Sequence, residues 1–336
     1  ALGLPGNLET NQRAQKSAVY SEVEWSPDPS LTLTAGVRAD YYEFLKEKFY
    51  PAPRFSLRLN ISSNHVLKAS SGIYYQSPSY VWVLNPSNRN LKALKNWMTV
   101  LGYETYPRTD TRVSLEAFYK DYSRLPAGTI PGVTDYIIIT NTGTEFGGRD
   151  DDFQSFGYFD LVSRGKGRAY GAELYIQKKN SEIPVFGQMS LTYSRSEFTA
   201  LNGRTYPAPF DQRFIFNLTG GYLPNKNWEL GFRFRLFTGT PYTPVYRPSE
   251  NPIRPGFVQN LPEEYLSDRL PVGHHLDLRI DRFFYFKGWT LVTYLDIQNI
   301  YNYKVPIRPR YDFWEDKIET SNAIGILPSI GIRANF

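Results

Sequence analysis

The sequence of 336 residues contains no cysteine and only three histidines. The absence of cysteine excludes a disulfide framework, a thiol nucleophile and a cysteine-ligated metal cluster. No segment approaches the roughly 20 consecutive apolar residues that a membrane-spanning helix needs. Runs of lysine and arginine are missing too, and basic residues alternate with acidic ones, so the net charge of +5 does not indicate nucleic-acid binding.

Aromatic residues are abundant: they make up 16% of the chain, with 26 tyrosines and 22 phenylalanines. Many stand at the ends of segments in which apolar and polar residues alternate. Near the C-terminus, Ile330, Ile332, Ala334 and Phe336 alternate with small or polar residues, so a strand here has one apolar and one polar face. This pattern is typical of an outer-membrane β-barrel, whose strands present apolar residues to lipid and polar residues to the lumen.

About 13 segments show this alternation, and most are close to the roughly ten residues that cross a bilayer at a tilt. Strands of a soluble β-sandwich, the competing fold, are usually about 5–6 residues long. The sequence therefore predicts an all-β fold, a transmembrane antiparallel β-barrel. The predicted strands are residues 17–25, 31–42, 54–61, 66–76, 96–105, 111–122, 167–179, 186–196, 213–222, 228–238, 275–284, 289–298 and 327–336.

Short turns rich in Pro, Asn, Asp and Ser alternate along the chain with long links. The long links are residues 77–95, 123–160, 197–210, 239–272 and 299–326, and long links are extracellular in outer-membrane barrels. If Phe336 lies in the periplasm, an odd number of strands places residue 1 on the extracellular side. A complete bacterial barrel has an even number of strands. We therefore expect residues 1–336 to be part of a larger barrel.

Six short segments are similar to those of one receptor family. They are residues 53–58 (PRFSLR), 115–122 (LEAFYKDY), 167–174 (GRAYGAEL), 210–213 (FDQR), 238–244 (TGTPYTP) and 294–302 (YLDIQNIYN). In this order and spacing, they resemble the C-terminal barrel region of TonB-dependent outer-membrane receptors. The resemblance extends from about residue 17 to residue 336.

The resemblance implies a 22-stranded barrel filled by an N-terminal plug domain. It also implies uptake of a scarce ligand, such as a siderophore, cobalamin or a glycan, driven by the inner-membrane TonB complex. The sequence shows no plug, TonB box or counterpart of the first nine strands, so residues 1–336 are expected to be the C-terminal portion of such a barrel. Two alternatives stay open: a structural or interaction barrel in a larger outer-membrane assembly, and an autonomous porin of about 14 strands.

Alternation assigns the charged side chains of the strands to the lumen, because Lys or Arg facing lipid costs about 2–4 kcal/mol near the bilayer midplane. Opposite charges on neighbouring strands predict ion pairs that satisfy one another. Docking of a plug or a polar solute is the functional alternative. The lumen-facing polar set includes Arg38, Arg58, Glu116, Glu173, Arg213, Arg233, Arg235, Asp277 and Arg279.

The extracellular links hold the candidate ligand-binding residues, since loops on a rigid scaffold carry function. Aromatic and arginine side chains suit sugars and ferric chelates, and equally lipopolysaccharide or a partner protein. Outer-membrane lipid and lipopolysaccharide are the expected neighbours of the barrel. The candidates are Tyr80, Trp82, Tyr242, Tyr246, Arg247 and Arg254.

Catalytic and metal-binding signals are weak. His275 and Asp277 share a strand face, but two residues apart is the ordinary same-face spacing and no GxSxG motif accompanies them. His274 and His275 point to opposite faces and cannot share a metal. The acidic residues 150–152, with Glu145, are expected to form a solvated loop tip. We expect no enzyme, metal or cofactor.

The C-terminal strand carries one further prediction. Its terminal aromatic residue, preceded by alternating apolar residues, resembles the assembly signal that the barrel-insertion machinery reads. Ile330, Ile332, Ala334 and Phe336 form this pattern.

Overall fold

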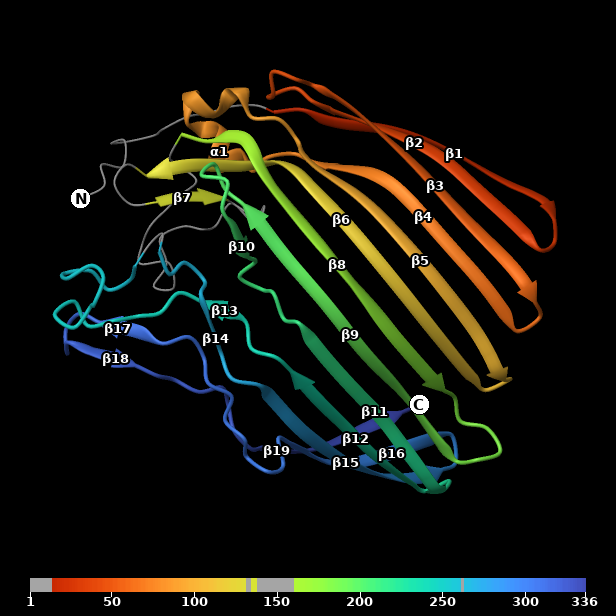
Figure 1. The fold of residues 1–336 in the computed structure, drawn as a ribbon. Coiled ribbons are helices and arrows are strands. Elements are labelled where there is room, and N and C mark those ends of the chain that lie inside the picture. The colour runs from red at the N-terminus through yellow and green to blue at the C-terminus, as the bar shows by residue number, and fades with distance from the viewer. Residues whose placement is uncertain (1–13, 131–133, 138–159, 261–262) are drawn as a thin grey trace.

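The computed structural model describes residues 14–130, 134–137, 160–260 and 263–336. Most of them form one antiparallel sheet in which thirteen strands follow each other in chain order (Figure 1). All 13 strands predicted from the alternation are confirmed. The strands are β1 (Lys16–Asp28), β2 (Leu31–Tyr42), β3 (Phe49–Ser62), β4 (His65–Gln76), β5 (Leu94–Arg108), β6 (Thr111–Ile130), β8 (Val162–Lys178), β9 (Val185–Thr199), β11 (Phe214–Asn225), β12 (Trp228–Phe237), β15 (Gly273–Phe286), β16 (Trp289–Gln298) and β19 (Leu327–Asn335).

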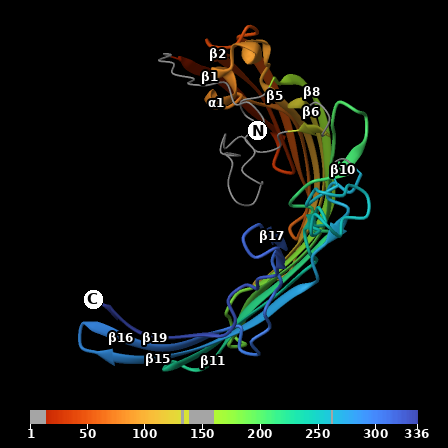
Figure 2. The same ribbon diagram turned by 90° about the vertical axis from the view of Figure 1, so that its left-hand side faces the viewer.

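The sheet is curved and open. Figure 2 shows it as an arc with β1 near one end and β19 near the other. Each strand pairs with the next one along the sheet, from β1 with β2 to β16 with β19. Among the described residues, β1 and β19 do not pair with each other. The outer edges of these two strands are therefore free to accept further strands.

The two faces of the sheet differ in polarity as the alternation predicts. Side chains converge on the concave face of a curved sheet and diverge on the convex face. The polar residues Asp40, Glu104, Asp277 and Asp281 are only 3–6% exposed, whereas the apolar residues Val37, Leu101 and Leu115 are 49–58% exposed. The charged set therefore lies on the concave face, which corresponds to the predicted lumen, and the apolar set covers the convex face.

Several strands are longer than predicted at the end that carries the long links, and β3, β6 and β8 extend furthest. β3 begins at Phe49. It pairs with β2 from Phe49 onward, whereas its pairing with β4 begins only at Arg54. Pro51 and Pro53 are tolerated there, since a strand with one neighbour has backbone positions that need no ladder donor. β6 and β8 also continue past residue 122 through a bulge at which Arg124 has a φ of 60°.

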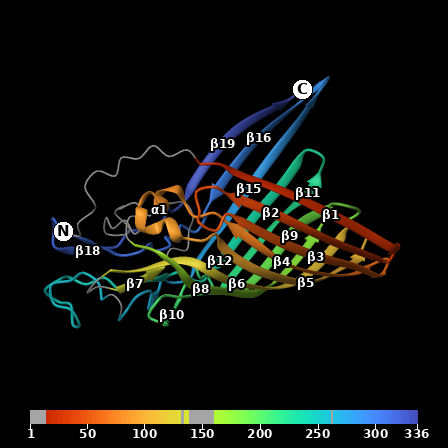
Figure 3. The same cartoon turned by 90° about the horizontal axis from the view of Figure 1, so that it is seen from above.

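The long links contain short regular elements of their own. Figure 3 places several of these at the same end of the strands. None of the helices in the described residues is long and apolar enough to cross a membrane. The elements are α1 (Tyr80–Leu84), the 3-10 helix η1 (Pro86–Asn90), β7 (Thr134–Ile137), β10 (Thr205–Pro207), β13 (Pro241–Tyr242), β14 (Asp268–Arg269), β17 (Arg310–Asp312) and β18 (Lys317–Glu319).

Buried apolar residues gather at this end of the sheet, beside α1. One cluster consists of Trp82, Leu91, Leu94, Leu125 and Leu161. A second consists of Tyr42, Leu45, Tyr50, Val83 and Ala93. The link of residues 77–93 is therefore packed onto β5 and β6, which gives the rim of the sheet a fixed shape.

Candidate ligand-binding surfaces

Two arginines of the predicted lumen-facing set are paired within their own strand. Arg38 donates from Nε and Nη2 to Asp40 at 3.0 and 2.8 Å. Arg279 donates to Asp281 in the same way at 2.7 and 2.8 Å. The prediction of ion pairs is confirmed for these arginines, but the expectation that they join neighbouring strands is wrong. Residues two apart on a strand share a face, so the partner is already beside the arginine.

Arg233 is the arginine of the set that does pair across strands. Its Nε donates to Asp277 Oδ2 at 2.8 Å, and the backbone N–H of Asn299 donates to Asp277 Oδ1 at 2.8 Å. Asp277 thus joins β12, β15 and the end of β16. Both carboxylate oxygens have partners other than His275, which leaves this aspartate with a structural function.

The two adjacent histidines lie on opposite faces. His275 is opposite Arg235 on the concave face, and His274 is opposite Leu236 on the convex face. His274 Nδ1 lies 2.8 Å from the Tyr301 hydroxyl. In the described part of the chain, no group of three or more His, Asp or Glu side chains is placed to hold a metal ion. The acidic segment 150–152 and Glu145 lie outside the described residues.

Glu116 and Glu173 face each other directly across β6 and β8 on the concave face. Glu173 accepts a hydrogen bond from the Thr192 hydroxyl at 3.1 Å, but neither carboxylate has a cationic partner among the described residues. Like charges in directly opposed positions destabilise a sheet. These two acids are therefore suited to bind a cationic group from outside the sheet. Three arginines of the same set also form no ion pair within the described ranges: Arg58, Arg213 and Arg235.

A three-residue ionic contact ties the extracellular rim together. Glu47, in the link between β2 and β3, binds Lys92 Nζ at 3.0 Å and Arg124 Nη1 at 3.0 Å. Burial alone would raise the pKa of the Glu47 carboxyl, but the hydrogen bonds and charges of Lys92 and Arg124 outweigh it and lower that pKa. The contact joins three segments that are distant in sequence and holds the rim in one arrangement.

The two candidates on α1 have opposite environments. Trp82 is 1% exposed inside the first apolar cluster, and Asn88 Nδ2 donates to its carbonyl oxygen at 2.9 Å. Tyr80 is 46% exposed, and Lys16 Nζ lies 4.4 Å from its ring centre. The structure corrects the expectation for Trp82, whose ring is enclosed by leucines and presents no surface to a ligand. Tyr80 remains an accessible aromatic residue.

The two tyrosines of residues 239–272 donate to acids of the same link. The Tyr242 hydroxyl donates to Asp268 Oδ2 at 2.8 Å, across the β13–β14 pair. Burial, followed by this hydrogen bond, raises the pKa of Tyr242 to about 12. The Tyr246 hydroxyl donates to Glu264 Oε1 at 3.2 Å, and burial together with this contact raises its pKa as well. Both phenols stay protonated at neutral pH and help to fold the link.

The two arginines of the same link are also paired. Arg247 donates to Glu250 at 3.1 Å, and Arg254 donates to Glu263 at 3.3 Å. Both partners of the Arg247 pair are exposed to solvent. Exposed ion pairs of this kind contribute only about 0.2–1 kcal/mol, so Arg247 can exchange Glu250 for an anionic ligand at little cost.

Sequence reasoning missed two aromatic residues in the link of residues 299–326. Phe313 is 71% exposed and Trp314 is 97% exposed, at the turn of the β17–β18 hairpin. The backbone N–H of Trp314 donates to Asp312 at 2.8 Å, which fixes the turn. Figure 2 shows β17 on the concave side of the sheet. The signal was present in the sequence, as adjacent aromatics flanked by acids in a long link.

The C-terminal pattern lies on the convex face. Ile330 and Ile332 are 83% and 76% exposed, and Ala334 points the same way. The ring of Phe336 lies 6.0 Å from that of Trp289. The strand is therefore displayed as an apolar ridge, and its function as an assembly signal stays a prediction.

Comparison with known proteins agrees with this architecture. A family model described as TonB dependent receptor-like, beta-barrel, matches residues 3–300. No curated protein sequence matches the chain. The solved structure of the FrpB iron transporter from Neisseria meningitidis has a TM-score of 0.65 at 15% identity, covering 95% of this chain and 45% of that one.

Two further solved structures are similar. The outer membrane transporter YddB from Escherichia coli has a TM-score of 0.66 at 13% identity, with 96% of this chain and 45% of that chain covered. The siderophore receptor PirA from Acinetobacter baumannii has a TM-score of 0.63 at 13% identity, with coverage of 95% and 45%. The chain thus spans about 45% of the length of these proteins. Since the family match covers most of the sequence, the chain belongs to the TonB-dependent receptor-like β-barrel family of the outer membrane.

Proposed function

We propose that residues 1–336 are the C-terminal portion of the barrel of a TonB-dependent receptor that takes up a scarce ligand across the outer membrane. The open sheet carries this proposal. Thirteen strands form an arc whose edges, β1 and β19, have no mutual hydrogen bonds in the described residues. A membrane barrel must close, because unpaired backbone groups cannot be left in lipid. Further strands between the two edges satisfy that requirement.

The concave face is suited to dock a plug domain. Glu116 and Glu173 oppose each other with no cationic partner among the described residues, and they face the space that a plug occupies in a complete barrel. An arginine or lysine of the plug would relieve the repulsion between them. Movement of such a plug by the inner-membrane TonB complex is the energy coupling that the family resemblance implies.

A ferric chelate is the favoured ligand class among siderophores, cobalamin and glycans. Two of the similar structures are described as an iron transporter and a siderophore receptor. The extracellular links of this chain present Tyr80, Trp314 and Arg247 as accessible side chains. Aromatic rings and a guanidinium together suit an anionic aromatic chelate.

An uptake assay tests this proposal. Cells that produce the full-length protein containing this chain are grown under iron limitation and given ⁵⁵Fe-loaded siderophores of several classes, and ⁵⁷Co-cobalamin in parallel. We expect uptake of one ferric siderophore to be lost when the gene is deleted and to stop when a protonophore removes the energy source.

A pair of variants locates the capture surface. Arg247→Ala should weaken capture of an anionic ferric chelate about tenfold, the loss of one charge-assisted contact. Arg204→Ala, an exposed arginine of the link between β9 and β11, is the matched control and should leave uptake unchanged. Uptake that survives the protonophore would indicate a porin, and no ligand-dependent uptake would favour a structural barrel in a larger assembly.

A further inference from the structure

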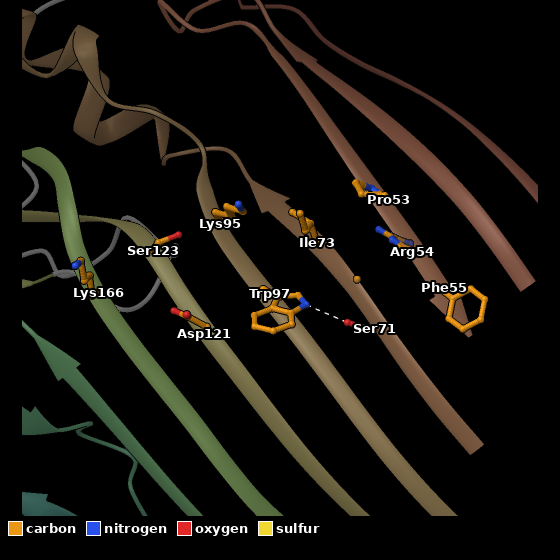
Figure 4. Close-up of a pocket in the computed structure, with 11 residues that line it drawn as sticks. Pro53, Arg54, Phe55, Ser71, Ile73, Lys95, Trp97, Asp121, Ser123 and Lys166 are labelled. Atoms are coloured by element: carbon orange, nitrogen blue, oxygen red, sulfur yellow. Dashed lines mark hydrogen bonds between the residues drawn. The ribbon is translucent and has the colours of Figure 1, made fainter. Parts of the chain in front are cut away.

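The convex face carries an open groove of about 650 Å³ near the extracellular end of the sheet. It crosses β3, β4, β5, β6 and β8, and Figure 4 shows its side chains on these adjacent strands. The groove lies on the face opposite the lumen and uses none of the candidate ligand-binding residues. None of its residues is on an edge strand, since the groove begins at β3 and β1 and β2 lie between it and the nearer open edge, so strands added at the edges leave it uncovered.

The groove lies where the apolar band of the barrel meets its polar rim. Outward-facing residues of β5 run from Lys95 through Trp97 to Leu101, and those of β6 run from Asp121 through Tyr119 to Leu115. Both series pass from charge through an aromatic ring to leucine. That order marks the membrane–water interface, and the adjacent long links make it the interface of the outer leaflet.

The wall of the groove is an exposed but fixed apolar surface. Trp97 is 48% exposed, and its Nε1 donates to the Ser71 hydroxyl at 3.0 Å. Ser71 in turn lies 3.0 Å from the Thr99 hydroxyl, so the indole is held against the sheet. Phe55, also 48% exposed, stands on β3 opposite Ser71 on β4, and Ile73 lines the groove two residues further along β4. Such a surface fits an acyl chain better than water.

Two lysines stand at the polar end of the groove without a partner in the described part of the chain. Lys95 is on β5 and Lys166 on β8, two strand spacings or about 10 Å apart. Long, flexible lysine side chains can converge on one anion across that distance. One acid, Asp121, also lines the groove, and it faces Arg168 across β6 and β8.

Three further cations lie at or near the groove: Arg54, which lines it, has its guanidinium 4.6 Å from the centre of the Tyr74 ring, and Arg168 and Arg195 are both paired with one acid. Arg168 Nη2 binds Glu197 at 2.7 Å, and Arg195 Nε binds the same carboxylate at 2.6 Å. Within the residues that the structure describes, the groove therefore offers two ammonium groups that have no ion-pair partner against one carboxylate, directly above an apolar wall. We propose that it binds a phosphorylated lipid of the outer leaflet, with an acyl chain along Phe55 and Trp97 and a phosphate between Lys95 and Lys166.

Native mass spectrometry of the full-length receptor in detergent tests this site. The probe is diphosphorylated lipid A, compared with the same lipid after removal of both phosphates and with inorganic phosphate alone. We expect K95Q/K166Q to bind the phosphorylated lipid at least about tenfold more weakly. K95R/K166R, which keeps both charges, should retain binding. K226Q/K287Q, two exposed lysines of the opposite, periplasmic turns, is the charge-matched control and should bind as the wild type does.

Several results would overturn the proposal. They are unchanged lipid binding by K95Q/K166Q, equal binding of the dephosphorylated lipid, or occupancy by inorganic phosphate as tight as that by the lipid. Heat-modifiable migration in electrophoresis confirms that each variant is folded, and the single variants K95Q and K166Q should each lose part of the affinity. The result does not depend on uptake, so it can fail while the proposed transport function stands.

Discussion

Replacement of Trp82 by alanine should unfold the extracellular link of residues 77–93 without removing any ligand contact. The indole is 1% exposed and packs against Leu91, Leu94, Leu125 and Leu161. Truncation of a buried aromatic residue to alanine costs about 3–5 kcal/mol, as lost transfer free energy and the cavity left behind. That magnitude exceeds the stability of many local elements, so the link should open while the strands of the sheet stay paired.

Hydrogen exchange of the receptor in detergent measures this effect segment by segment. Amides of residues 80–94 should exchange much faster in W82A, and those of β11 and β12 should not change. W314A is the matched control, because the same side chain in another link is 97% exposed and its removal should change local stability by less than about 0.5 kcal/mol. Equal exchange in W82A and W314A, or lost ligand binding with unchanged exchange in W82A, would refute the reasoning.

Three further predictions concern the rim and the sheet. The pKa of Glu47 is lower in the folded protein than its ordinary value of 4.5, so the ionic contact stabilises the rim fully at pH values above 4.5, and this stabilisation is lost as the pH falls through the lower pKa of the folded state. The rate of proteolysis of the rim should therefore increase at acidic pH in the wild type and should not change with pH in E47Q. G171A should assemble poorly in the outer membrane, as judged by the amount of folded barrel, because an added Cβ would overlap the carbonyl oxygen of Tyr193 on the neighbouring strand. G231A is the control and should assemble normally, because the atom nearest to an added Cβ at that position is 3.8 Å away. E116Q/E173Q should loosen a docked plug and raise permeability of the outer membrane to a large antibiotic; unchanged permeability would remove these acids from plug docking.

Alternation was sufficient to find the strands and their faces because a membrane-spanning strand contacts lipid on one side and water on the other. Every outward residue from Leu31 to Tyr41 must then be apolar, and charges such as Arg38 are left only the inner face. The same rule did not predict strand ends, since β6 and β8 continue beyond the membrane, where the outward side no longer needs to be apolar. Hydrogen bonds to a neighbouring strand decide those ends.

The environment of individual side chains also depended on contacts between distant segments. Trp82 and Trp314 look alike in sequence, as aromatic residues in long links, yet one is enclosed by leucines of β5, β6 and two links and the other is fully exposed. Ion-pair partners were predicted on neighbouring strands, but Asp40 already lies beside Arg38 on the same strand. Composition cannot distinguish these cases, because burial and pairing are properties of the assembled rim.

The sequence by itself determined the class of fold, the number of long strands, the polarity of each face and the family, because all of these follow from a period of two and from short local motifs. Only the tertiary structure decided that the thirteen strands form an open arc, that Glu116 opposes Glu173, and that Lys95 and Lys166 stand above an exposed tryptophan with no ion-pair partner among the described residues. The alternation of apolar and polar residues is a property of a single strand. Closure of the sheet, the side chains that face each other across two strands and the ion pairs they form depend on the register between strands that are far apart in the chain.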